Sequence, residues 1–148
     1  RECELDTIVR RAVRRFAGEF IGRKLKLCYE PLNASCVTDE KWLLFVVEQV
    51  LSNALKYTRT GSITIELEAP KTLVIRDTGI GVAPEDLPRI FEKGYTGYNG
   101  RGDQKASGLG LYLCRTICKR LGHTITASSV PDHGTAIRIT LEQRQVRE

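Results

Sequence analysis

The stretch TLVIRDTGIGV at residues 72–82 joins a strand-like apolar run to an aspartate and two closely spaced glycines. Residues 73–75 are typical of a buried or half-buried strand. One glycine is enough to turn a chain out of a strand, so the second, Gly81, indicates backbone that lies close to something flat or charged. Taken alone, DTGIG also fits a tight turn with Asp77 capping a helix, and the rest of the chain must decide between these interpretations.

The hydrophobic pattern on either side of this stretch predicts alternating helices and strands. The expected helices lie at residues 4–18, 40–57, 84–91 and 110–121. The expected strands lie at residues 24–30, 62–68, 72–77, 124–129 and 135–141. Asp39 is placed to cap the second helix, and Gly122 to end the last one. The order predicts an α/β (α+β) two-layer sandwich, in which helices cover one face of a mixed β-sheet, as a single domain over residues 1–148.

The composition, with 41% hydrophobic and 28% charged residues, is ordinary for a globular domain. The net charge of +5 comes from lysines and arginines spread along the chain, so nucleic-acid binding is not expected. No apolar run approaches the roughly 18 residues of a membrane span, so no direct membrane contact is expected. Five cysteines without a CxxC pair indicate free thiols in a reducing compartment rather than zinc ligands. Because the chain starts at Arg1 and holds no Met, we expect a fragment of a longer protein.

A glycine-rich segment, KGYTGYNGRGDQKASGLG, occupies residues 93–110. A loop of this length inside a compact domain is usually functional, and its glycines predict mobility. Gly108 and Gly110 fall at the start of the helix expected at 110–121. Free backbone N–H groups and the helix dipole favour an anion there, although an N-cap by Ser107 followed by flexible glycines explains the same residues.

Three polar residues of the helix at 40–57, namely Gln49, Asn53 and Lys56, lie within about 60° of one another on a helical wheel. Tyr57 lies one step round the helix. Two amides and a lysine in line could meet a metal ion and phosphate oxygens. A solvated helix face is the alternative explanation.

Together these stretches resemble one family. The matching segments are EQVLSNALKYT (48–58) with the N box, DTGIGV (77–82) with the G1 box, RIFEKGYTG (89–97) with the F box, SGLGLYL (107–113) with the G2 box, and HGTAIRITL (133–141) with the closing strand. The chain thus resembles, over about residues 4–142, the ATP-binding catalytic domain of bacterial sensor histidine kinases, within the gyrase, Hsp90, histidine kinase and MutL group. Details of the F and G2 boxes are most similar to Gram-positive kinases that respond to cell-envelope antibiotics.

The resemblance implies the Bergerat ATP-binding fold and a site for ATP and Mg²⁺. Asp77 would accept a hydrogen bond from the adenine amine, and the glycines at 79 and 81 would let the backbone approach the base. Asn53 would coordinate Mg²⁺ and Lys56 would touch phosphate. The other base-side and pocket residues implied are Tyr57, Gly79, Ile80, Val82, Leu111 and Thr135.

The resemblance also implies a mobile ATP lid at residues 93–107, anchored by Phe91. The candidates for neutralising the γ-phosphate are Lys93, Arg101 and Lys105. The backbone donors to phosphate would be Gly108, Leu109 and Gly110. One departure is Gln49, which stands where many members carry asparagine, so its role as a magnesium ligand is in doubt. The role of Glu48 as a water-activating base is in doubt as well, because it points about 100° away from Gln49.

A histidine kinase also needs a phospho-accepting histidine on a dimerising helical domain. His123 and His133 lie in other contexts and are expected to be structural. The fragment should therefore bind ATP without phosphorylating itself. The resemblance implies a membrane-anchored, homodimeric parent whose cytoplasmic part includes a dimerisation domain and whose partner is a response regulator. The alternatives are an ATPase clamp, an anti-sigma-type serine kinase and a degenerate nucleotide-binding module, and residues 142–148 are expected to be a frayed tail.

Overall fold

The computed structural model describes residues 1–95 and 110–141. The helices are α1 (Leu5–Arg15), α2 (Ala17–Gly22), α3 (Glu40–Tyr57), the short 3₁₀ helix η1 (Leu87–Arg89) and α4 (Gly110–Leu121). The strands are β1 (Glu2–Glu4), β2 (Lys26–Tyr29), β3 (Ser35–Val37), β4 (Ser62–Glu68), β5 (Thr72–Asp77), β6 (Thr124–Val130) and β7 (Gly134–Thr140).

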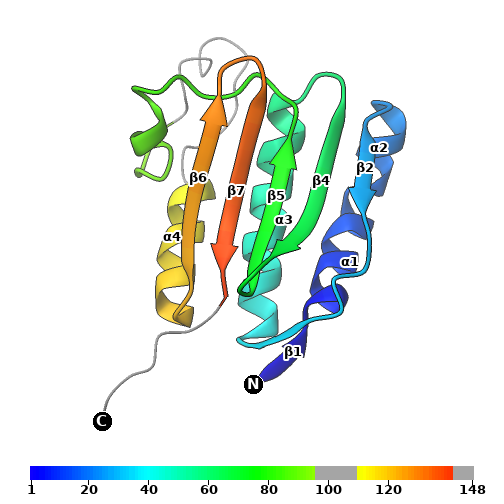
Figure 1. Cartoon of the computed structure of the whole chain (residues 1–148), viewed down its shortest axis with the longest axis vertical. Helices are drawn as coiled ribbons and strands as arrows, with labels where there is room; N and C mark the ends of the chain where they lie inside the picture. Colours follow the sequence, from blue (N-terminus) through cyan, green and yellow to red (C-terminus); the bar gives the residue numbers. More distant parts are fainter. Residues whose placement is uncertain (96–109, 142–148) are drawn as a thin grey trace.

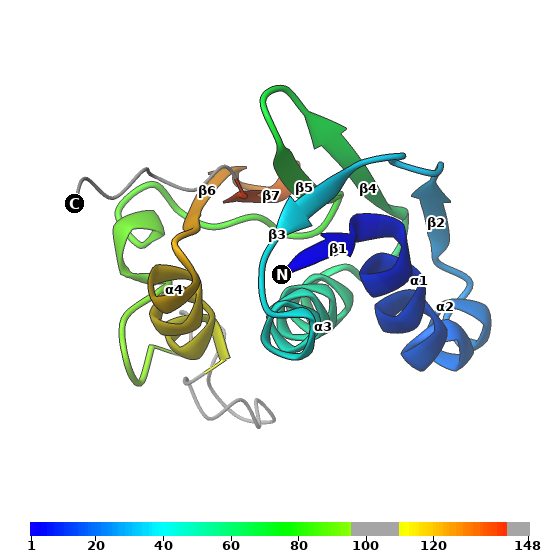
Figure 2. The ribbon, with the colours of Figure 1, turned by 90° about the horizontal axis from the view of Figure 1, so that it is seen from below.

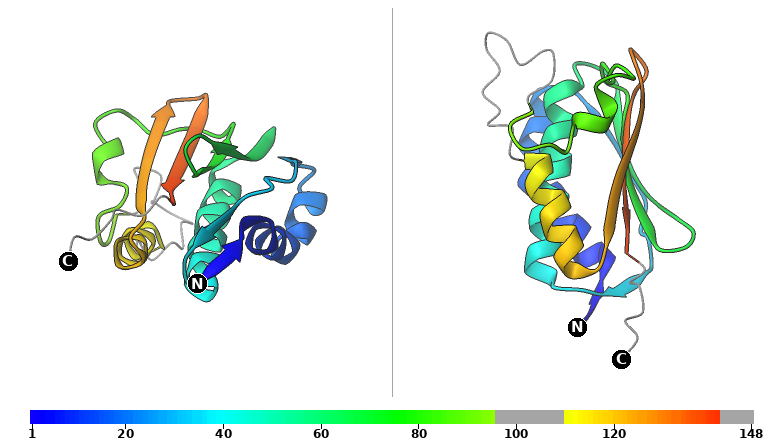
Figure 3. Two further views of the ribbon diagram at one scale, coloured as in Figure 1. Left: turned by 60° about the horizontal axis from the view of Figure 1, so that its bottom comes forward. Right: turned by 90° about the vertical axis from the view of Figure 1, so that its left-hand side faces the viewer.

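Five strands form one mixed sheet in the order β2-β4-β5-β7-β6 (Figure 1). The β2–β4 pair is parallel and the other pairs are antiparallel. Helices α1 to α4 all lie on one side of this sheet, so the domain has two layers (Figure 3). The short strands β1 and β3 form a separate antiparallel pair near the N-terminus (Figure 2). The predicted two-layer fold is therefore confirmed.

The core lies between the sheet and the helices because one face of each central strand is apolar. Ile65 of β4 pairs with Ile75 of β5, which in turn pairs with Ile137 of β7. All three side chains are at most 5% exposed. The apolar stripe of α3 covers them with side chains that are also at most 5% exposed, namely Leu43, Val46, Val47, Val50, Leu51 and Ala54. Burial of this alternating pattern fixes the register, since a slip by one residue would expose it.

Two helix boundaries follow their predicted signals. The Asp39 side chain accepts a hydrogen bond from Trp42 N at 3.2 Å and caps α3. Helix α4 ends at Gly122, whose φ of +85° is left-handed. Gly122 N donates to Lys119 O at 3.2 Å and His123 N donates to Cys118 O at 2.8 Å, which together form a Schellman motif.

Other boundaries differ from the sequence prediction. The helix expected at 4–18 is two helices, because the chain leaves helical geometry at Phe16. The helix expected at 84–91 is reduced to the three residues of η1, since Pro88 has no N–H to donate. Strands β1 and β3 were not predicted, because three residues are too few to show alternation. Among the described residues, no helix is both long and apolar enough to cross a membrane.

Candidate functional site

Asp77 ends β5, where its side chain is 8% exposed. Its Oδ1 accepts hydrogen bonds from Gly79 N at 2.8 Å and from Thr135 N at 3.1 Å. Its Oδ2 accepts no hydrogen bond from residues 1–95 or 110–141. Burial raises the pKa of Asp77, and the two N–H donors partly oppose this shift. The carboxylate is therefore held in one orientation by Oδ1 and presents Oδ2 to a further donor.

The loop that follows Asp77 is held by hydrogen bonds on both sides. Ile80 N donates to the carbonyl of Tyr57, the last residue of α3, at 3.1 Å. On the other side, Asp132 N donates to Ile80 O at 2.7 Å. Val82 N donates to Ser129 Oγ at 2.7 Å. The loop is thus fixed between the end of α3 and the β6–β7 turn.

Three glycines allow these segments to approach each other. A Cβ on Gly79 would collide with Tyr57 O, and one on Gly81 would collide with Val130 O. A Cβ on Gly134 would collide with the backbone carbonyl of Asp77. Packing within the chain therefore already requires glycine at these positions, and the approach of Gly79 and Gly81 to an adenine base stays a prediction.

Three of the predicted site residues lie on α3. Gln49 and Asn53 are half-buried and Lys56 is exposed. Within residues 1–95 and 110–141, the Asn53 side chain makes no hydrogen bond and Lys56 Nζ has no carboxylate partner, although Lys56 Nζ lies 5.7 Å from the centroid of the Tyr57 ring. Burial lowers the pKa of Lys56 and raises that of Tyr57. The part of the chain that the structure describes thus leaves Asn53 and the Lys56 ammonium without a hydrogen-bond partner, so both can bind a ligand.

The structure separates Gln49 from Glu48. A Cβ on Gly110, the first residue of α4, would lie 3.2 Å from Gln49 Oε1, so the Gln49 amide faces the start of that helix. Glu48 instead forms an ion pair with Arg15 of α1 at 2.8 Å. Gln49 therefore shares a surface with the N-terminus of α4, whereas Glu48 is engaged in joining two helices.

The segment after η1 contributes two of the predicted residues. Phe91 is 8% exposed and packs in the core, with the Arg115 guanidinium 5.9 Å from its ring centroid. Lys93 Nζ lies 6.0 Å from the centroid of the Tyr112 ring on α4. Leu111 is half-buried in the first turn of α4. The predicted residues Arg101, Lys105, Gly108 and Leu109 lie outside the described residues, as do most of the predicted lid and the tail at 142–148.

Two residues of this region were missed by the sequence analysis. Ser129 accepts from Val82 N and donates to Gly134 O at 2.9 Å, so it ties the loop to the β6–β7 turn. Ser129 continues the alternation of the inward-facing Ile125 and Ala127. A polar residue at such an inward position is the signal that could have identified it. Thr58 is fully buried, and none of the described residues forms a hydrogen bond with its Oγ1.

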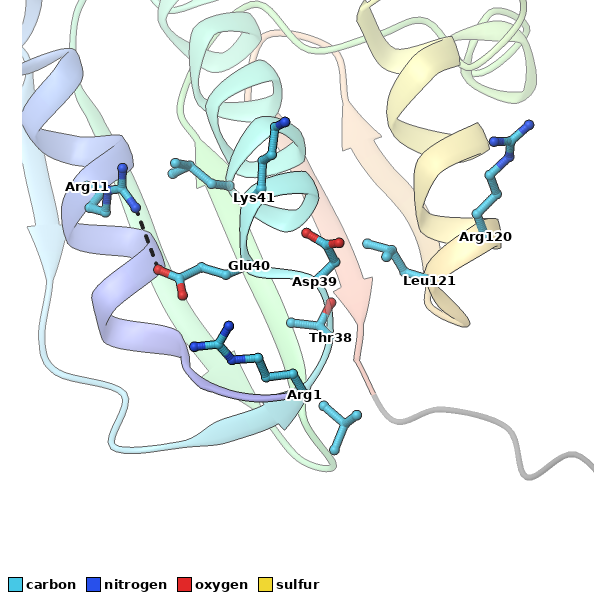
Figure 4. A pocket seen from close by; sticks show the side chains of 10 residues that line it. Arg1, Arg11, Thr38, Asp39, Glu40, Lys41, Arg120 and Leu121 are labelled. Carbon is cyan, nitrogen blue, oxygen red and sulfur yellow. Dashed lines mark ion pairs between the residues drawn. The ribbon is translucent and has the colours of Figure 1, made fainter.

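A cleft of about 690 Å³ lies at the opposite end of α3 (Figure 4). Its walls include Arg1, Val37, Thr38 and Arg120. The side chains drawn in Figure 4 do not converge on one point, and Arg11 is paired with Glu40 at 3.6 Å. The cleft is separate from the residues around Asp77.

Comparison with known proteins identifies the family. Residues 38–145 match the model of the histidine kinase-, DNA gyrase B- and HSP90-like ATPases. The chain therefore belongs to this family, as the motifs predicted.

Curated relatives narrow the resemblance to sensor kinases. The chain is 41% identical over 108 residues to sensor histidine kinase YxdK of Bacillus subtilis (strain 168), which covers 70% of this chain and 33% of YxdK. It is 39% identical over 105 residues to sensor protein kinase GraS of Staphylococcus aureus (strain JH1), covering 69% of this chain and 30% of GraS. The chain thus spans about a third of the length of these relatives.

A solved structure supports the fold. The catalytic domain of histidine kinase ThkA superposes with a TM-score of 0.81 at 20% identity, covering 94% of each chain. The order of strands and the single helical layer are therefore those of a known catalytic-domain fold.

The residues described here fit the nucleotide and metal that this family implies. Asp77 is a buried residue whose Oδ2 accepts from none of the described residues, and the half-buried Asn53 amide has no partner among them either. Lys56 and the start of α4 suit phosphate oxygens. Asn53, and Gln49 if its longer side chain reaches, offer the oxygen ligands that Mg²⁺ prefers.

Proposed function

We propose that this chain is the ATP-binding catalytic domain of a sensor histidine kinase. In the parent protein it would transfer the γ-phosphoryl group of ATP to a histidine on a dimerisation domain outside this chain, for relay to a response regulator. The observation that carries the proposal is the Asp77 carboxylate, fixed by two backbone donors through Oδ1 and open at Oδ2. The parent would be a membrane-anchored homodimer with this domain in the cytoplasm.

The residues of this chain would act by binding and orienting the substrate. Asp77 Oδ2 would accept a hydrogen bond from the adenine amine, with Tyr57, Ile80 and Val82 against the base. Asn53 would hold Mg²⁺, which supplies charge neutralisation to the triphosphate. Lys56, with Lys93, Arg101 and Lys105 as further candidates, would neutralise phosphate charge, and Gly108 to Gly110 would donate backbone N–H groups. Catalysis would thus rest on positioning and charge rather than on a base in this chain.

Two observations disfavour a hydrolytic ATPase clamp. Glu48 is paired with Arg15, and the next residue, Gln49, is an amide that cannot take a proton from water.

Among the described residues, His123 is buried against Thr38 at 2.9 Å, so it is not placed to accept phosphate. The chain alone should therefore bind ATP and release phosphate only slowly.

Calorimetric titration of ATP–Mg²⁺ into the chain, with phosphate release followed in parallel, tests this function. We expect Asp77→Asn to weaken binding by about 100-fold or more, because a buried charge-assisted hydrogen bond is lost. The matched control is Asp132→Asn, an exposed aspartate in the β6–β7 turn whose left-handed φ of +67° suits asparagine. Unchanged binding by Asp77→Asn would contradict the proposed site, and rapid phosphate release by the wild-type chain would favour the ATPase clamp.

A further inference from the structure

Two cysteines face each other across the small sheet formed by β1 and β3. The strands are antiparallel, and their register places Cys3 directly opposite Cys36. Opposed residues of an antiparallel pair project to the same side of the sheet. Both side chains are buried there, with exposures of 7% and 2%, and both thiols are free.

The spacing of this pair suits a disulfide. Thr38 N donates to Arg1 O at 2.8 Å, and Leu5 N donates to Ala34 O at 2.9 Å. These bonds lie two residues to either side, so alternation makes Cys3 and Cys36 a hydrogen-bonded pair, with Cα atoms about 5.5 Å apart. Disulfides form at Cα separations of about 4.4–6.8 Å. The Cβ atoms must approach slightly, which makes the bond strained and easily reduced.

The chemistry of the two thiols sets their order of reaction. Burial, together with the neighbouring Cys3, raises the pKa of Cys36 to about 11. Cys36 is therefore a poor first nucleophile. Cys3 is the more exposed of the two, and its Sγ lies 3.6 Å from Arg1 O and 3.7 Å from Thr38 O at the end of the short sheet.

We propose that Cys3 and Cys36 form a reversible disulfide by exchange with a low-molecular-weight disulfide, RSSR. The Cys3 thiolate attacks one sulfur of RSSR, which forms a mixed disulfide and releases RS⁻. The released thiolate takes the proton of Cys36, and the Cys36 thiolate attacks the Cys3 sulfur and expels the second RS⁻. The two cysteines lose two electrons and two protons, and RSSR is reduced to two RSH.

The bond would tie the first strand of the chain to the segment that starts α3. Cys36 is followed closely by Thr38 and by Asp39, which caps α3. Arg1, Val37 and Thr38 also line the cleft of Figure 4, so the disulfide would fix one wall of that cleft. The closed loop contains α1, α2 and β2, so the bond would stabilise the fold by restricting the unfolded chain, and its strain would offset part of that gain.

The other cysteines lack this geometry. Cys114 and Cys118 lie four residues apart on α4, and their Cβ atoms are about 5–6 Å apart on a rigid helix. Cys28 of β2 lies opposite Thr64 of β4. They therefore serve as internal controls.

The test is to equilibrate the reduced, folded chain in buffers of reduced and oxidised glutathione, quench with acid, and measure intact mass and peptide maps. We expect a mass about 2 Da lower, a cross-link joining the Cys3 and Cys36 peptides, and a Tm raised by roughly 5–10 °C. Dithiothreitol should reverse all three changes. Cys28→Ser should behave like the wild type, whereas Cys36→Ser should form at most a mixed disulfide with glutathione.

Three outcomes would overturn the proposal. One is a folded wild-type chain that keeps five free thiols throughout the glutathione series. Another is a cross-link that maps to Cys28, Cys114 or Cys118. The third is a Cys36→Ser variant that still loses two hydrogens. Because intact mass is measured on the wild type, the result does not depend on whether a variant folds.

Discussion

The two ends of α3 differ in how far their polar groups are satisfied within the chain. At the N-terminal end, hereafter the capped end, Asp39 accepts from Trp42 N, Glu40 pairs with Arg11, and Thr38 bonds to His123. At the C-terminal end, hereafter the nucleotide end, Asn53 and one oxygen of Asp77 have no partner among the described residues.

The difference supports the proposal that a ligand binds at the nucleotide end. A buried polar group without a hydrogen bond costs about 1–3 kcal/mol, and a half-buried one such as the Asn53 amide costs less because water can still reach it. The buried Thr58 Oγ1, also without a partner, belongs to the same end. A ligand that supplies donors and cations there would recover part of this cost, and at the capped end His123 Nδ1 is the buried side-chain atom that the described residues leave without a partner.

The largest effect is expected from adding a side-chain atom at the nucleotide end, where two backbone segments lie very close together. Gly134→Ala should lower the free energy of unfolding by about 3 kcal/mol or more, because the new Cβ would collide with Asp77 O at a left-handed φ of +112°. The control is Gly94→Ala, with a φ of +87° but no atom within 4 Å, which should cost about 1 kcal/mol. Denaturant titration measures both, and equal losses would show that the close approach is unimportant.

Removing the side-chain amide of Asn53 on α3 tests whether this group serves a ligand rather than the fold. Asn53→Ala should leave stability nearly unchanged, since the Asn53 side chain makes no hydrogen bond to residues 1–95 or 110–141. It should also remove the dependence of ATP affinity on Mg²⁺, a difference of about tenfold in the wild type. Calorimetry with and without EDTA measures this, with the adjacent Ser52→Ala as control. A magnesium dependence that survives in Asn53→Ala would assign the metal to other residues.

The capped end should respond to acid through His123. Burial lowers the pKa of His123, so the unfolded chain binds a proton at a higher pH than the folded one. Its contribution to stability is therefore complete above the unfolded pKa of about 6.5 and is lost as the pH falls below it, by at most about 1.4 kcal/mol per pH unit.

Denaturant titrations between pH 8 and pH 5 check this slope. His123→Gln should flatten it, and the exposed His133 provides the control His133→Gln, which should not. If the free energy of unfolding depended on pH equally in the wild type and both variants, groups other than His123 would cause the acid sensitivity.

The sequence predicted long, strongly patterned elements well and short ones poorly. Helix α3 was predicted to the residue, because its apolar stripe and the Asp39 cap agree. Strands β1 and β3 were missed, since their three-residue pairing depends on tertiary contact between segments 33 residues apart. The break at Phe16 has no proline or cap to announce it.

For the site, residue types were predictable but their mutual support was not. The motifs predict roles for Asp77 and Asn53 that still need to be tested, yet nothing in the sequence says that Thr135 N and Gly79 N share one oxygen of Asp77. The close approach of the Asp77 carbonyl to Gly134 is also visible only in the folded structure. Alternation places Ser129 on the inner face, but only the fold supplies Val82 as its partner.

The most direct test of the central claim compares ATP with inosine triphosphate, in which a carbonyl replaces the adenine amine. If Asp77 Oδ2 reads that amine, the wild-type chain should bind ATP about 100-fold more tightly, because carboxylate and carbonyl are both acceptors. Asp77→Asn should narrow or invert the ratio, since Oδ1 stays on its two backbone donors and the new NH₂ faces the base. Equal affinities in the wild type, or a ratio unchanged by Asp77→Asn, would contradict the account.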